Sequence, residues 1–159
     1  MIIVRAFEHG LAGIAAANPD VKLNLDRDPA ISDGLVLRVS YPAPTDDPAG
    51  RDVWCEAEQT DWTSGRSISF QVKPGAALKL SVSFFDRNRV AYTTWVELQG
   101  GLWQPVRLAF ENLRPNPYFQ PPEANTGTSI DVSEVRGVAF APHDAGSGQL
   151  ALSRFVVVP

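Results

Sequence analysis

The sequence is poor in the residues that most often carry chemistry. Its 159 residues include one cysteine, one methionine and two histidines. The single cysteine, Cys55, excludes an internal disulfide. His9 and His143 each lie near an expected turn, with no Ser-His-Asp or Cys-His arrangement and no metal-ligand spacing around them. Glycine-rich phosphate loops are also missing. The motifs of nucleophilic, zinc and nucleotide-phosphate chemistry are therefore absent from the sequence.

Long hydrophobic runs and an excess of basic residues are missing as well. No segment approaches the ~18 consecutive apolar residues of a membrane span. The first residues lack the basic, apolar and small-residue succession of a signal peptide. The net charge of −4 opposes the binding of nucleic-acid phosphates. We therefore expect neither a membrane nor a nucleic acid as a partner.

Turn-forming residues are plentiful, and they separate short apolar runs. The chain has 13 prolines and 12 glycines, and its 44% hydrophobic and 20% charged residues are typical of a globular domain. Short runs divided by Pro and Gly favour an all-β domain with many turns. The length fits one domain that spans residues 1–159.

The clearest strand signals are four alternating segments between residues 68 and 110. In each of them, apolar residues alternate with polar or small ones, which predicts strands with one covered face. Residues 10–17 are expected to be weakly helical or irregular. Further strands are expected at 2–7, 21–25, 35–41, 52–58, 135–140 and 150–158. We predict a two-sheet antiparallel β-sandwich of the jelly-roll type.

The polar faces of two of these strands each carry a large ring and a carboxylate. Trp95 and Glu97 share the polar face of their strand. Trp54 and Glu56 share the face opposite the small apolar residues of theirs. A sugar ring has an apolar CH face and a rim of hydroxyl groups, so it needs an aromatic platform and polar partners. These four residues are candidate sugar-binding residues.

Four other residues are candidates for the same surface. Gln71 and Arg107 lie on the polar faces of their strands and are expected to share the face of Glu97. Tyr92 is a candidate rim residue, although its place in the alternation puts it with the core residues. Tyr118 lies in the proline-rich stretch 114–128 and either closes one end of a cleft or pins this loop to the body.

Three motifs in order resemble those of a known family. Residues 7–10, Phe-Glu-His-Gly, resemble the opening of jelly-roll carbohydrate-binding modules. Asp-Trp-Thr at 61–63 and the strand at 68–73 resemble their "D-W-S … L-x-F-x-V-K" segment, and residues 103–110 resemble "W-Q-x-V-x-I-P-F". The order and spacing are similar to family 11 carbohydrate-binding modules. They are also similar to galactose-binding-like domains and to the complex I intermediate-associated protein domain.

The resemblance has implications for the scaffold and for a metal. It implies that Trp62 and Trp103 belong to the packed scaffold. It also implies a structural calcium ion, with Glu8 and Asp33 as ligands. Ser153 stands where the family usually has a second carboxylate, which removes one oxygen ligand that calcium prefers.

The leading functional hypothesis is a non-catalytic carbohydrate-binding module. It would bind a β-glucan-like polysaccharide chain in the cleft of its polar sheet. It would belong to a longer exported enzyme and lie outside the cell or in the periplasm, tethered to a catalytic domain. One alternative is an assembly domain of the complex I intermediate-associated type that contacts its partner through Tyr118 and Phe119. Another is a small lyase or hydrolase, with Glu56 and Glu97 facing each other across the cleft.

Overall fold

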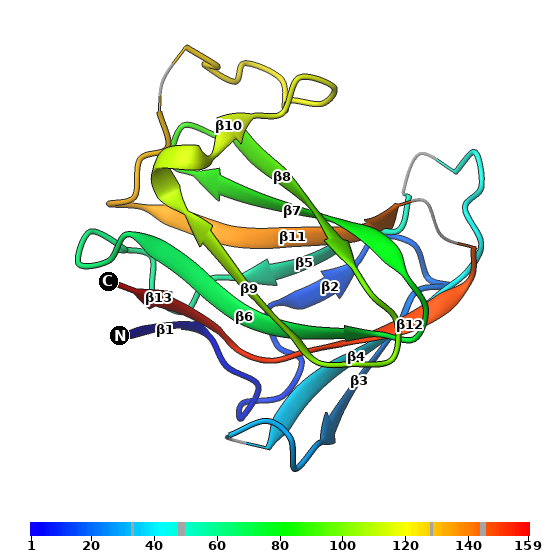
Figure 1. Cartoon of the computed structure of the whole chain (residues 1–159). Coiled ribbons are helices and arrows are strands. Elements are labelled where there is room, and N and C mark those ends of the chain that lie inside the picture. Colours follow the sequence, from blue (N-terminus) through cyan, green and yellow to red (C-terminus); the bar gives the residue numbers. More distant parts are fainter. Residues whose placement is uncertain (33, 48–49, 128, 144–145) are drawn as a thin grey trace.

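The fold consists of two antiparallel β-sheets that pack face to face (Figure 1). It comes from a computed structural model that describes residues 1–32, 34–47, 50–127, 129–143 and 146–159. Within these ranges the one helical element is the short 3₁₀ turn η1 (Phe110–Asn112), and no helix has the length and apolar character needed to cross a membrane. The predicted all-β sandwich of the jelly-roll type is confirmed.

One sheet, called the large sheet below, contains the described strands β1 (Ile2–Arg5), β3 (Lys22–Arg27), β4 (Leu35–Tyr41), β6 (Ser67–Pro74), β9 (Gln104–Ala109), β12 (Gly148–Leu152) and β13 (Phe155–Val158). β9 pairs along one edge of β6, while β13 and β12 share the other edge. The sheet continues from β13 to β1 and from β12 through β4 to β3. β6 is therefore its central strand.

The other sheet, called the small sheet, contains the described strands β2 (Ile14–Ala16), β5 (Val53–Glu56), β7 (Leu78–Asp86), β8 (Ala91–Leu98), β10 (Arg114–Pro115) and β11 (Val135–His143). Its strand order is β10-β8-β7-β11-β5-β2. The long strands β7, β8 and β11 lie together in its middle, so this sheet offers its broadest surface there (Figure 1).

The four alternating strands of residues 68–110 are divided between the two sheets. β6 and β9 belong to the large sheet, whereas β7 and β8 belong to the small one. The link from β6 to β7 and the link from β8 to β9 pass close to each other, since Gly101 N–H donates to Pro74 O at 2.7 Å. A Cβ on Gly100 would lie 2.7 Å from the Ala76 Cα, so this close passage requires glycine. The alternation identified the covered face of each strand, but it carried no information about which sheet the strand joins.

Two other boundaries differ from those expected from the sequence. Residues 10–17, expected to be weakly helical or irregular, contain the strand β2, which pairs with β5. Residues 150–158, expected as one strand, form β12 and β13, which are separated at Ser153 and Arg154. Ser153 N–H donates to Gln71 O at 2.9 Å, and its hydroxyl accepts from Gln71 N–H at 2.7 Å. These bonds replace regular strand pairing at the break.

The inner faces of the two sheets form one hydrophobic core, closed at one end by Trp62. This residue is fully buried, and its ring contacts Phe84 and Phe110 with centroid distances of 5.9 and 5.8 Å. Its indole N–H donates to Gln59 O at 2.8 Å. The expected packing role of Trp62 is thus confirmed. Cys55 is also fully buried, and burial raises the pKa of its thiol to about 12, which keeps it uncharged at neutral pH.

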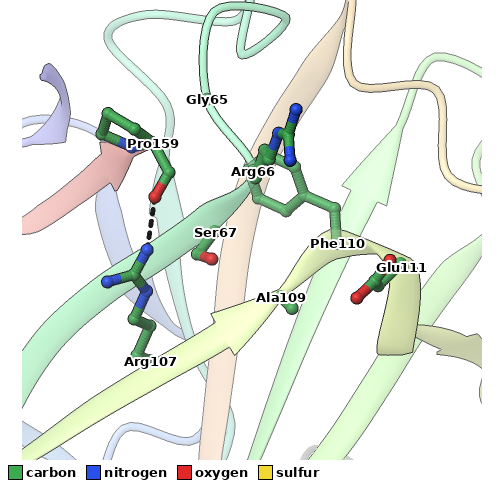
Figure 2. Close-up of a pocket in the computed structure, with 8 residues that line it drawn as sticks. All are labelled: Gly65, Arg66, Ser67, Arg107, Ala109, Phe110, Glu111 and Pro159. Atoms are coloured by element: carbon green, nitrogen blue, oxygen red, sulfur yellow. Dashed lines mark hydrogen bonds between the residues drawn. The ribbon is translucent and has the colours of Figure 1, made fainter.

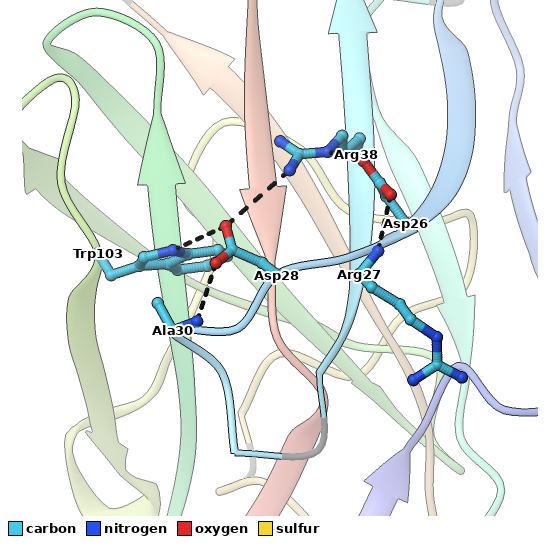
Figure 3. Close-up of polar contacts among 6 residues, drawn as sticks. All are labelled: Asp26, Arg27, Asp28, Ala30, Arg38 and Trp103. Carbon is cyan, nitrogen blue, oxygen red and sulfur yellow. Dashed lines mark hydrogen bonds and ion pairs between the residues drawn. The ribbon is translucent and has the colours of Figure 1, made fainter.

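The outer face of the large sheet carries a cluster of paired polar groups (Figure 3). Trp103 Nε1–H donates to Asp28 Oδ2 at 3.3 Å, and Arg38 lies between Asp26, at 2.8 Å, and Asp28, at 3.9 Å. The hydrogen bond from Ala30 N–H lowers the pKa of Asp28, with smaller contributions from Trp103, Lys73 and Arg38. Trp103 therefore links the segment before β9 to the segment after β3, in keeping with its expected scaffold role.

Candidate functional site

The outer face of the small sheet contains a groove of about 580 Å³. Its walls are aromatic and come from β5, β7, β8 and the loop after β10. The rings that line it are Trp54, Phe85, Trp95, Tyr118 and Phe119. In the described part of the chain, this face therefore gathers five aromatic side chains around one hollow.

The rings meet in two pairs at opposite corners of the groove. Trp54 and Phe85 pack edge to face with centroids 5.5 Å apart, and Trp95 and Tyr118 do so at 6.1 Å. Trp54 is on β5 and Trp95 on β8, so β11 and β7 lie between them. Strand spacing and register separate their backbones by ~16 Å. Each pair can provide a ring to a different part of an extended ligand.

Gly137 makes room for Trp54 against the sheet. A Cβ on this glycine would lie 2.5 Å from atoms of the Trp54 ring and 2.6 Å from Cys55 O. Real Cβ atoms essentially never approach other atoms so closely. The indole therefore lies over the backbone of the neighbouring strand and forms part of the groove wall.

Small side chains form the floor between the two aromatic corners. Ser81 Oγ donates to Ala141 O at 3.3 Å, and the hydroxyls of Ser83 and Thr93 lie 2.7 Å apart. Ala139 completes this floor. Since these hydroxyls already have partners, the floor mainly provides depth. A flat ligand can approach the sheet closely there.

Two ionisable residues line another part of the groove. Asp52 directly precedes β5, and His143 ends β11. Burial raises the pKa of the Asp52 carboxyl, and the nearby His143 partly opposes this effect. Both residues also line a smaller hollow of about 250 Å³ beside the groove. Asp52 and His143 are the ionisable lining residues suited to bind hydroxyl groups of a ligand.

Three of the eight predicted binding residues line the groove: Trp54, Trp95 and Tyr118. Glu56 and Glu97 lie on the same face of the sheet but outside the lining. They are three strands and about six residues of register apart, a separation of ~20–25 Å. Paired glycosidase carboxylates lie ~5–10 Å apart, so this pair does not form such a site.

Gln71 and Arg107 are placed elsewhere, and the expectation that they share the face of Glu97 is wrong. They lie on β6 and β9, which belong to the large sheet. Arg107 donates to Pro159 O in a separate hollow of about 540 Å³ that Arg66 and Phe110 also line (Figure 2). The physical reason is that the chain leaves the large sheet after β6 and returns to it only with β9, so Glu97 on β8 lies in the other sheet.

Tyr92 is not a rim residue. It is fully buried in the core, so the expectation that it contacts a ligand is wrong. It pairs across the strands with Phe84, whose side chain is also buried. The alternation along β8 had already placed Tyr92 on the inner face, and in this case the alternation was right.

Sequence reasoning did not select several residues that the fold brings into the groove: Asp52, Ser81, Ser83, Asn116 and His143. Two of them had a usable signal. Ser81 and Ser83 alternate with the core residues of β7 and were therefore predicted to be on an outer face. Asp52, Asn116 and His143 lie at strand ends, and their neighbours across the groove depend on how the strands pair.

One of the two expected calcium ligands, Glu8, lies within the described residues. Glu8 has its side chain 61% exposed, and the imidazole Nε2 of His9 lies 3.7 Å from its carboxylate. The described ranges contain no cluster of three Asp, Glu, His or Cys residues that could hold a metal. Asp33 lies outside the described residues. Calcium binding through Glu8 and Asp33 therefore stays a prediction that thermal unfolding with calcium and with chelator can test.

Comparison with known proteins identifies relatives of the fold. The sequence matches no family model, and no curated protein matches it. A family 11 carbohydrate-binding module from Clostridium thermocellum, solved in complex with a β-1,3-1,4-mixed-linked tetrasaccharide, has a TM-score of 0.74 at 16% identity. The match covers 98% of this chain and 94% of that module. The expected resemblance to family 11 is therefore confirmed for the fold.

Two further solved structures extend this finding. A family 30 carbohydrate-binding module of a Clostridium thermocellum cellulosomal cellulase has a TM-score of 0.61 at 15% identity, covering 91% of this chain and 90% of that chain. An agarase has a TM-score of 0.70 at 15% identity and matches this whole chain with 26% of its own length. The fold thus occurs both in separately solved modules and as part of a longer enzyme.

Proposed function

We propose that this chain is a non-catalytic carbohydrate-binding module that holds a β-glucan-like polysaccharide chain in the groove of the small sheet. The observation that carries the proposal is the pair of aromatic corners, Trp54 with Phe85 and Trp95 with Tyr118, on either side of a floor of small residues. Aromatic faces stack on the CH faces of sugar rings. Two platforms ~16 Å apart suit several linked sugars better than a single one.

The polar partners in this proposal are Asp52 and His143. They line the same groove as the rings. A carboxylate that accepts hydrogen bonds from two neighbouring hydroxyl groups can fix the orientation of a sugar ring. The rings would then supply contact area, and the polar groups would select the sugar.

The fold relatives support this reading in two ways. The family 11 module was solved with a mixed-linked β-glucan oligosaccharide, and a related fold forms part of an agarase. We infer from this that the chain is tethered to a catalytic domain in a longer exported protein. The wide separation of Glu56 and Glu97 supports binding without catalysis. The assembly-domain alternative has no comparable support among the fold relatives.

Affinity electrophoresis tests the proposal. The protein is run in gels that contain mixed-linkage β-glucan, xyloglucan, xylan, mannan, agar or alginate. We expect retardation by a neutral glucan and no retardation of the Trp54→Ala/Trp95→Ala variant. Free migration of the wild type in every gel would refute sugar binding.

Variants of the large sheet provide the matched control. Gln71→Ala and Arg107→Ala change exposed residues that lie outside the groove. We expect both to be retarded like the wild type. If Arg107→Ala migrates freely while the double tryptophan variant is retarded, the binding face is the large sheet and the groove assignment is wrong.

A further inference from the structure

The two most exposed rings of the groove stand on one short turn. Tyr118 is 86% exposed and Phe119 is 60% exposed, yet Tyr118 meets the edge of Trp95 with centroids 6.1 Å apart at 75°. A ring on a free loop would have to be ordered when a ligand binds, and ordering weakens affinity. The contacts below this turn show how it is held before binding.

Asn116 joins the turn to the groove floor through both ends of its carboxamide. Its Oδ1 accepts from Tyr118 N–H at 2.8 Å and from Phe119 N–H at 3.2 Å. Its Nδ2 donates to Thr93 Oγ1 at 3.1 Å, and this hydroxyl lies 2.7 Å from Ser83 Oγ. One side chain therefore connects the backbone under the two rings to two strands of the small sheet.

Gln120 closes the other end of the same turn. Its Nε2 donates to Ala91 O and to Asn116 O, both at 3.0 Å, and its Oε1 accepts from Ala91 N–H at 2.9 Å. Asn116 N–H also donates to Ala91 O at 2.8 Å. Asn116 and Gln120 are thus both hydrogen-bonded to the start of β8, and Tyr118 lies between these two anchored residues.

We propose that Asn116 is a positioning residue of the groove, which holds Tyr118 beside Trp95 so that this aromatic corner exists before a ligand arrives. The inference rests on the proposed sugar-binding function and deepens it. Asn116 has the shape this role needs, because a carboxamide can accept from two backbone N–H groups and donate to a hydroxyl at the same time. An aspartate would keep the acceptors but lose the donor to Thr93.

A double-mutant cycle tests the role in binding. Affinity for mixed-linkage β-glucan is measured by calorimetry for the wild type, Asn116→Ala, Tyr118→Ala and the double variant. We expect Asn116→Ala to weaken binding about threefold to tenfold, since the turn must then be ordered on binding. We expect the double variant to bind no more weakly than Tyr118→Ala alone. The proposal would be overturned if the double variant lost affinity by the product of the two single losses. Wild-type affinity of Asn116→Ala would overturn it as well.

A matched control lies in the same loop. Asn125 Oδ1 accepts from Gly127 N–H at 3.2 Å, and this residue does not line the groove. Asn125→Ala should bind glucan like the wild type. Asn116→Asp should fall between the wild type and Asn116→Ala because it keeps the two backbone acceptors. Thermal unfolding of every variant shows that each one is folded.

Amide hydrogen exchange tests positioning without any sugar. The Tyr118 and Phe119 amides should exchange slowly in the wild type and in Asn125→Ala, and faster in Asn116→Ala. Equal exchange in the wild type and Asn116→Ala would overturn the positioning role. If the wild type binds no glycan but shows this difference, the sugar-binding function fails while the positioning of Tyr118 by Asn116 stands.

Discussion

The outer faces of the two sheets both carry tryptophan and charged residues, but these residues make different contacts on the two faces. On the large sheet, the Trp103 N–H is bound to Asp28, and Arg38 lies between Asp26 and Asp28. On the small sheet, aromatic rings contact one another edge to face around a groove of about 580 Å³. Polar groups that already form hydrogen bonds and ion pairs with one another leave few donors and acceptors for a ligand. The comparison teaches that tryptophan on an outer face indicates a binding site only where a hollow remains beside it.

The largest effect is expected from filling the space under Trp54. In Gly137→Ala, the new methyl group would meet the indole ring at 2.5 Å and Cys55 O at 2.6 Å. Strain of this kind costs about 1–3 kcal/mol of unfolding free energy. Urea unfolding should show this loss, and glucan affinity should fall because the ring is displaced.

Gly146 provides the control for this change. A Cβ there meets nothing within 4 Å. Gly146→Ala should therefore leave both stability and affinity close to those of the wild type. A Gly137→Ala protein with wild-type stability and affinity would contradict the described packing of Trp54.

The next effect separates the tryptophans of the two faces. Trp54→Ala and Trp95→Ala should each weaken glucan binding about fivefold to tenfold, since one aromatic stacking contact contributes about 1–1.4 kcal/mol. Trp103→Ala should keep wild-type affinity, although it loses the hydrogen bond to Asp28. Isothermal titration calorimetry measures all three. A tenfold loss in Trp103→Ala alone would reverse the assignment of the two faces.

The comparison of the faces also explains which features of the fold and the site could be predicted from the sequence. The period-two alternation identified the strands of residues 68–110 and placed Trp95 and Trp54 on outer faces. These were local properties of each strand. Ordered motifs at residues 7–10, 61–63 and 103–110 indicated the fold family, because scaffold residues such as Trp62 leave a recognisable pattern.

The sheet to which each strand belongs is not a local property. Gln71 and Trp95 have the same alternation pattern, yet they lie on opposite sides of the molecule, because the chain changes sheets after β6 and again after β8. Gly100 and Gly101 marked the second of these links but could equally have marked a hairpin. Asp52 and His143 meet in the groove through the pairing of β5 with β11, which joins residues far apart in the sequence.

A smaller effect concerns the charge of Asp52 beside the groove. Partial desolvation raises the pKa of this carboxyl above its ordinary value of 3.8, against the opposing effect of His143, so ionisation is somewhat less favourable in the folded protein than in the unfolded chain. The stability that this group contributes is present below pH ~4 and is lost as pH rises through the raised pKa. Asp52→Asn should therefore be more stable than the wild type at pH 7, with the difference vanishing in acid.

The same variant should bind glucan more weakly, because a carboxamide accepts hydrogen bonds less strongly than a carboxylate. Thermal unfolding between pH 3 and pH 8 and calorimetry at pH 7 measure the two effects. A destabilised Asp52→Asn at pH 7 would show that contacts hold the ionised carboxylate in place. Its role would then resemble that of the carboxylates on the large sheet.

The smallest effect is expected at Asp28, with the opposite sign. Hydrogen bonds from Ala30 and Trp103 and the charges of Lys73 and Arg38 lower the pKa of this carboxyl below 3.8. Its stabilising contribution is present above pH ~4 and is lost as pH falls through the lowered pKa. Asp28→Asn should therefore be slightly less stable than the wild type at pH 7 and equal to it in strong acid. Thermal unfolding of both proteins from strong acid to pH 7 measures this stability difference. A difference that does not change with pH would show that Asp28 acts through its shape rather than its charge.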